Sequence, residues 1–134
     1  MIKITTAGLF LILQFSFSSV FSACEDPPAA GVDWNNCIKR SVILIGMDLR
    51  NANLSSTDFM FADLENTDLS GANLSGSIML GANLEGVNFE NSNMTSAYLT
   101  KAKIAGAIFN GAILDSTYWV NGQQCSSKSI GLCK

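Results

Sequence analysis

One residue in every five is large and apolar from Leu49 to Trp119. An α-helix advances about 500° over five residues, so these side chains would scatter around its circumference. A straight strand would send residues five apart to opposite faces. The chain is therefore predicted to turn every five residues and to stack these fifteen side chains in a core: Leu49, Leu54, Phe59, Leu64, Leu69, Leu74, Met79, Leu84, Phe89, Met94, Leu99, Ile104, Phe109, Leu114 and Trp119.

The positions around each central residue follow the same period. The residue two before the centre is small in most units and is alanine in eight of them. The residue one before the centre is Asp or Asn in nine of fifteen units, and Gly, Asn or Ser predominates two residues after it. Gly, Asn and Ser favour turn conformations. The pattern predicts corners at these positions and outward-facing side chains on either side of each centre.

Three segments carry this pattern in its clearest form, namely Ala-Asn-Leu-Ser-Ser at 52–56, Gly-Ala-Asn-Leu-Ser-Gly at 71–76 and Gly-Ala-Asn-Leu-Glu-Gly at 81–86. They resemble the signature of pentapeptide-repeat proteins, and the resemblance covers residues 47–121. It implies an all-β fold, a right-handed quadrilateral β-helix with four pentapeptides per coil. The 75 residues of this range make just under four such coils.

The N-terminal segment has the composition of a secretory signal peptide. Lys3 precedes an apolar run from Ala7 to Phe21, which is shorter and richer in serine than the roughly 20 apolar residues of a membrane span. Residues 1–23 are predicted to be removed, so that the mature chain is periplasmic or extracellular and has no transmembrane segment. A lipid anchor at Cys24 stays open, although lipidation would leave Cys37 without a partner.

Four cysteines lie outside the repeat, at Cys24, Cys37, Cys125 and Cys133. In an oxidising compartment they indicate disulfides, and three connectivities are possible. Pairing of near neighbours is the simplest because it closes short loops. Solenoids need caps at both ends, and tails of this kind resemble those of exported members of the family. Residues 24–46 are therefore predicted to form an N-terminal cap and residues 122–134 a C-terminal disulfide cap.

The composition argues against catalysis and against nucleic-acid binding. The chain has no histidine, so we expect no catalytic residue, metal site or cofactor. Without residues 1–23 it has seven basic residues, since Lys3 is lost from eight, and eleven acidic ones. Nucleic-acid binders rely on clustered Lys and Arg. Family members that confer quinolone resistance mimic DNA, but export disfavours inhibition of a topoisomerase-like target by this chain.

An apolar strip is expected on one side of the solenoid. Ile78, Tyr98 and Tyr118 replace Asp or Asn at positions twenty apart and therefore share a face. Leu80 and Val120 lie across the centre from them, with Met60 and Phe61 below. This face predicts an exported, non-enzymatic scaffold that binds an unknown protein partner or a second copy. Two alternatives are a structural envelope protein without a specific ligand and burial of the strip by a terminal segment.

Overall fold

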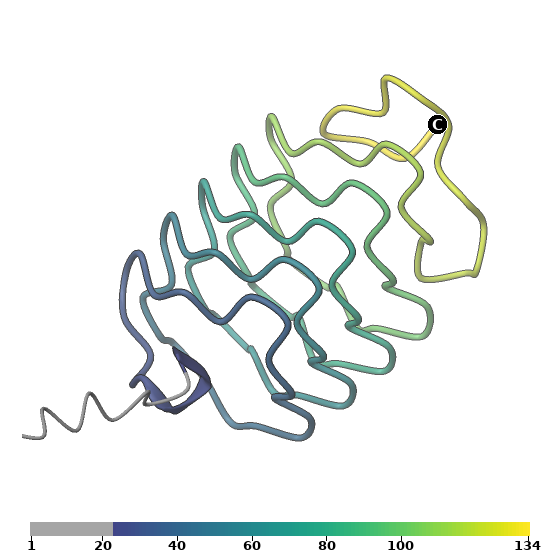
Figure 1. Ribbon diagram of the computed structural model, residues 1–134. Coiled ribbons are helices and arrows are strands. Elements are labelled where there is room, and N and C mark those ends of the chain that lie inside the picture. Colours follow the sequence, from purple (N-terminus) through teal and green to yellow (C-terminus); the bar gives the residue numbers. More distant parts are fainter. Residues whose placement is uncertain (1–22) are drawn as a thin grey trace, which may run out of the picture.

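The chain forms a stack of square coils in the computed structural model, which describes residues 23–134 (Figure 1). Within this range the single helical element is the 3-10 helix η1, Ala23–Glu25. The coils are held by parallel bridges between residues twenty apart, from Asp33 with Asn53 to Tyr98 with Tyr118. A bridging residue recurs every five positions, so each coil has four sides. The predicted signal peptide lies, except for Ala23, outside the described residues.

The four sides are named here by the bridging residues that stack along them. Face A carries Asp33, Asn53, Asn73, Asn93 and Ile113. Face B carries Ile38, Asp58, Ile78, Tyr98 and Tyr118. Face C carries Ile43, Asp63, Asn83 and Lys103, and face D carries Asp48, Asp68, Asn88 and Ile108. Among residues 23–134, faces A and B thus have five levels, and faces C and D have four.

Each corner is a tight turn with one residue in the left-handed region. At the first corner of the second coil the N–H of Ala52 donates to the carbonyl of Leu49 at 3.2 Å, and Asn51 between them has φ of 58°. A positive φ at the third turn residue is typical of a type II turn, which favours Gly and Asn. The same φ recurs every five residues, which explains the Gly, Asn and Ser of the sequence pattern.

The preference for Asp or Asn before each centre has a hydrogen-bonding cause. The ladder uses the N–H of the central residue but offers no backbone acceptor to the N–H that follows it. A carboxylate or amide oxygen supplies that acceptor. Asn73 Oδ1 accepts the N–H of Ser75 at 3.1 Å, and Asp68 Oδ1 accepts that of Ser70 at 3.0 Å.

The core is a set of four columns of central side chains. Twelve of the fifteen predicted members are fully buried, whereas Ile104, Phe109 and Trp119 near the C-terminal end are partly buried. On face D, Phe89 and Phe109 stack with ring centroids 5.1 Å apart. Trp119 packs tilted against Phe109, also at 5.1 Å, and closes the column.

The solenoid begins earlier than residue 47, because the ladder starts at Asp33 inside the predicted cap segment 24–46. Trp34 and Leu44 are central residues of this first coil and are buried. Lys39 takes the central position between them, which hides the coil in the sequence. This position is tolerated because it lies at the open end of the stack. The coil count expected from residues 47–121 was therefore too low.

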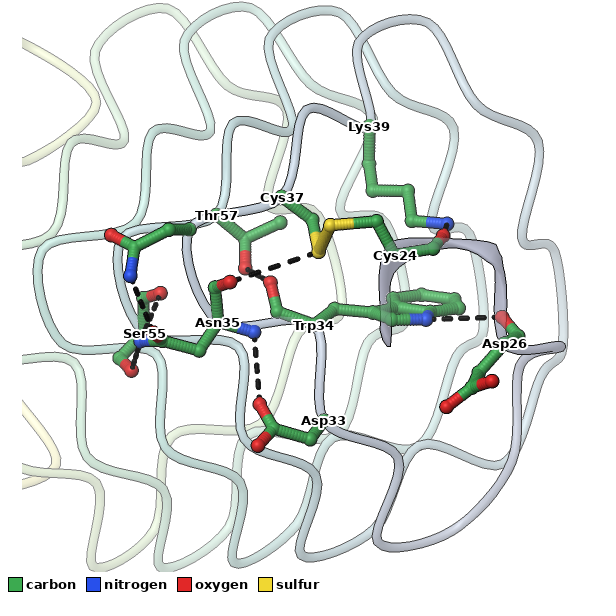
Figure 2. Close-up of a disulfide and its surroundings, with 10 residues drawn as sticks. Cys24, Asp26, Asp33, Trp34, Asn35, Cys37, Lys39, Ser55 and Thr57 are labelled. Atoms are coloured by element: carbon green, nitrogen blue, oxygen red, sulfur yellow. Dashed lines mark hydrogen bonds between the residues drawn. A yellow bond between two sulfur atoms is a disulfide. The ribbon is translucent and has the colours of Figure 1, made fainter. Parts of the chain in front are cut away.

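The N-terminal cap is built over the end of this first coil (Figure 2). Cys24 and Cys37 form a disulfide with a Cα–Cα distance of 5.4 Å. The Lys39 ammonium lies 4.0 Å above the centre of the Trp34 ring and donates a hydrogen bond to the carbonyl of Cys24. Trp34 Nε1 donates to the carbonyl of Asp26 at 3.0 Å. These contacts cover the end of the core.

The C-terminal tail closes the other end by pairing with the last coil. Ile113 bridges to Ile130 and Tyr118 to Gln124, both antiparallel. The Cys125–Cys133 disulfide, with a Cα–Cα distance of 5.0 Å, fixes the returning loop. Both disulfides join near neighbours, as expected for caps. The tail thereby pairs backbone groups that would otherwise form an open edge.

Glycine at one corner lies close to a side chain of the coil below, which gives a test of the stacking. A Cβ at Gly71 would lie 2.3 Å from Asn51 Oδ1 of the coil below, whereas one at Gly46 would meet nothing within 4 Å. The two residues have φ of +67° and +66° and share the cost of the left-handed region, about 1 kcal/mol. Because the end of the Asn51 side chain can turn aside, we expect Gly71→Ala to lower the thermal midpoint only slightly more than Gly46→Ala.

Replacing Asn51 by Gly in the Gly71→Ala background should recover much of the difference, since it removes the clashing side chain. A higher midpoint for Gly71→Ala than for Gly46→Ala would contradict the contact between neighbouring coils.

Candidate interaction face

Face B combines the apolar residues that the sequence placed on one side. Ile78, Tyr98 and Tyr118 bridge in successive levels. The Tyr98 and Tyr118 rings stack with centroids 4.7 Å apart and planes at 5°. Aromatic pairs in this geometry contribute about 0.5–1.5 kcal/mol beyond their burial. The coil itself brings these rings together, because each is at the same position in successive levels.

Phe61 extends this surface to the corner between faces B and C. It has φ of 58° at a position otherwise suited to Gly or Asn, and its side chain is 62% exposed. A Cβ added at Gly81 would lie 2.7 Å from Phe61 Cε1, so the ring passes directly over that glycine. The apolar strip therefore runs from the corner onto the flat side.

No segment within residues 23–134 folds over the strip. Tyr98 is 42% exposed, while Ile78, Leu80, Tyr118, Met60 and Val120 are half-buried by their neighbours in the stack. The C-terminal tail lies instead at the end of the stack, with Ser129 and Cys125 accepting the N–H groups of Leu114 and Ser116. The tail pairs with the strip at its last level, where Gln124 bridges to Tyr118.

Two features of face B were missed from the sequence. Ile38, 76% exposed, adds a first level to the strip, and counting the period back through Trp34 would have found it. Asp58 interrupts the strip at the second level and is nevertheless buried. Its carboxylate accepts Arg40 Nε at 2.6 Å and the N–H of Met60 at 3.0 Å. The one acidic group on this face is thus internally paired.

The apolar residues of face B lack the hydrogen bond that Asp and Asn supply elsewhere, as do Ile43, Lys103, Ile108 and Ile113 on the other faces. At Ile78, Tyr98 and Tyr118 there is no side-chain oxygen for the N–H groups of Leu80, Thr100 and Val120. Within residues 23–134 these three N–H groups have no protein acceptor. A hydrogen bond of this kind contributes about 1 kcal/mol. Asp or Asn at these positions would therefore stabilise the repeat more than the apolar residues of the strip do.

Charges elsewhere are on the polar sides. On face D the Arg50 guanidinium contacts the Asp48 carboxylate at 2.7 Å, and its hydrogen bond lowers the pKa of Asp48 to about 2. Because this pKa is lowered from 3.8, the pair stabilises the fold above that pH and loses its effect as the pH falls toward 2. Both groups are exposed, so the contribution is small.

From Ala23 to Lys134 there is no pocket and no cluster of three or more His, Cys, Asp or Glu residues suited to a metal ion. The four cysteines are all in disulfides, so the Sγ of Cys24 is not available for a lipid in this structure. In the same range no helix has the length and hydropathy to cross a membrane.

Comparisons with known proteins agree with this architecture. A family model described as "Pentapeptide repeats" matches eight copies over residues 41–76 and 77–115. No curated protein matches the sequence significantly. Rfr23, a pentapeptide-repeat protein from the cyanobacterium Cyanothece 51142, is 25% identical with a TM-score of 0.54, covering 63% of this chain and 78% of its own.

Two further solved structures are informative in different ways. The pentapeptide-repeat protein alr5209 from Nostoc PCC 7120 is 24% identical with a TM-score of 0.59, covering 65% of this chain and 82% of its own. QnrB1, a plasmid-mediated fluoroquinolone resistance protein, covers 74% of this chain and 69% of its own, but with 12% identity and a TM-score of 0.34. The last likeness is too low to bear on function.

The exposure of the strip predicts how the fold responds to a polar replacement. We expect Ile78→Asn together with Tyr98→Ser to change the free energy of unfolding by less than about 1 kcal/mol, since surface substitutions cost little. The Asn side chain also restores an acceptor for the N–H of Leu80, which offsets the lost ring stacking. Phe59→Ala in the core below the strip is the control and should cost about 3–5 kcal/mol.

Urea unfolding of the wild type and the two variants measures this difference. If the face B variant lost as much stability as Phe59→Ala, the strip would belong to an intramolecular core.

Proposed function

The chain belongs to the pentapeptide-repeat family, and we propose that it is an exported, non-enzymatic scaffold that binds another protein through face B. Members of this family are right-handed quadrilateral β-helices, and they are generally structural or interaction modules rather than enzymes. The observation that carries the proposal is the uncovered apolar-aromatic strip of face B. The bridging positions of face A, by contrast, are mostly polar, with Asn53, Asn73 and Asn93 at its middle levels.

Two physical arguments favour an interaction surface. Contiguous exposed apolar patches on soluble proteins tend to mark binding sites, and aromatic residues are enriched at interface cores. Each replacement of Asp or Asn on face B also gives up a backbone hydrogen bond. A partner that covers the strip would compensate for this loss by removing apolar surface from water, at about 25 cal/mol per Å².

Export is supported by the cysteines and by the N-terminal composition. Disulfides such as Cys24–Cys37 and Cys125–Cys133 persist in oxidising compartments. Lys3 and the apolar run that follows it are typical of a secretory signal. We place the mature protein in the periplasm or outside the cell, with its N-terminus at Ala23 or Cys24.

The DNA-mimic alternative finds no support on the candidate face. Its single acidic residue, Asp58, is buried and paired with Arg40, whereas a mimic of DNA needs rows of exposed acids. The competing function is a structural envelope protein without a ligand. In that case face B would have no partner.

Crosslinking in the native compartment followed by mass spectrometry tests the proposal. We expect one reproducible protein partner for the wild type and its loss in the variant with Ile78→Asn and Tyr98→Ser. A matched double variant on face A, Asn73→Ser with Asn93→Ser, should keep the partner. The intact mass of the same preparation should show an N-terminus at Ala23 or Cys24 and no alkylated thiol.

Crosslinks that are unaffected by the face B variant would reject this surface. The absence of any reproducible partner would favour the structural envelope protein, and a lipid mass on Cys24 would replace the soluble mature form by an anchored one.

A further inference from the structure

We infer that face B binds a second copy of this chain, with the two stacks antiparallel about a two-fold axis that crosses the third level. This inference rests on the proposed role of face B and names its partner. The axis lies in the plane of the face and perpendicular to the stack. It pairs the third level with itself, the second with the fourth and the first with the fifth, so one flat strip covers the other along its whole length.

The middle of such an interface is apolar and small. Ile78 and Leu80 of the third level lie opposite the same residues of the second copy, because the axis passes through their level. At the neighbouring corner the Phe61 ring lies over Gly81 and adds to the apolar surface of this level. At the ends, the exposed Ile38 of one copy lies opposite Tyr118 of the other. The contacts of the third level lie on the axis, and the contact between the first and fifth levels occurs twice.

The charges around the strip fit the antiparallel arrangement. On face C, beside the strip, Asp63 lies in the second level and Lys103 in the fourth. The two-fold axis therefore brings Asp63 of each copy toward Lys103 of the other. At the corner between faces B and C, the Phe61 ring lies over Gly81 of the third level, so the axis brings the Phe61 rings of the two copies toward each other.

The parallel arrangement, with the axis along the stack, lacks these pairs. Every level would then meet its own level, and the corner of Phe61 and Lys101 would meet the opposite corner of face B. Lys101 would lie against Ser96, and the carboxylate of Asp58 against Met60. Charge complementarity thus selects the antiparallel dimer.

The size of the face limits the strength of association. Five levels spaced by about 4.8 Å give a surface of roughly 20 Å by 15 Å, or about 300 Å² per copy. The total for the two copies, about 600 Å², is below the roughly 1,000 Å² that a stable, specific interface buries, so only a weak, transient dimer is expected. The dimer should therefore form reversibly, with a dissociation constant on the order of hundreds of micromolar or weaker.

Sedimentation equilibrium of the purified, disulfide-bonded protein over a series of concentrations tests this inference. The wild type should show a monomer–dimer equilibrium. Lys103→Asp creates two like-charge contacts and should weaken the dimer roughly tenfold. Adding Asp63→Lys to Lys103→Asp should restore it, whereas Lys134→Asp, an equal change of charge at the C-terminus, should leave it unchanged.

A second variant keeps the test independent of the charge pair. Ile78→Asn on the axis should abolish dimerisation while the thermal midpoint stays near that of the wild type. Ile43→Lys probes the first coil of face C, where Ile43 is 73% exposed, and should have little effect.

A monomer at every concentration would overturn the inference. So would a dimer that Ile43→Lys abolishes and Lys103→Asp does not, because that dimer would use the N-terminal end of the stack. A monomeric protein that still crosslinks one foreign partner through face B would leave the proposed function standing, so the two failures are distinguishable.

Discussion

The turn at every fifth residue is the constraint on which the rest of the molecule depends. At each corner the N–H of one residue bonds to the carbonyl three positions earlier, as from Thr57 to Leu54 at 3.2 Å. Four such corners return the chain to the residue twenty positions before, where the parallel bridge forms. The coils therefore stack through this local turn geometry alone. Each position of the five-residue unit lies in the core, on a flat side or at a corner.

The same regularity makes departures from the repeat meaningful. A polar side chain before the centre completes the hydrogen bonding of its own side, so Asp and Asn are locally favoured. The residues that break this rule on face B gather in successive levels and remain open in the described residues. The apolar residues of face B give up hydrogen bonds within their own units, yet they form one continuous exposed surface. Binding of a partner to this surface explains both features, and both proposals rest on it.

The periodic parts of the structure could be predicted from the sequence, and the ends could not. The core columns, the corners and the strip of Ile78, Tyr98 and Tyr118 all follow from a period of five and a coil of twenty. The first coil was missed because Lys39 has the wrong chemistry for a central position. Only contacts distant in sequence, with Trp34 and the Cys24 carbonyl, make it acceptable there. The burial of Asp58 likewise depends on Arg40 across eighteen residues, which no local pattern reveals.

Comparison of Leu74→Lys with Asn73→Lys by urea unfolding tests the square-coil account most directly, because the two residues are neighbours with opposite roles. Leu74 is fully buried in the core column, so a charge there should cost roughly 4 kcal/mol or more. Asn73 points outward and accepts bonds from Ser75, so its replacement should cost about 1–2 kcal/mol. A large difference between the two variants is the predicted result, and equal losses of stability would contradict the stacked coil.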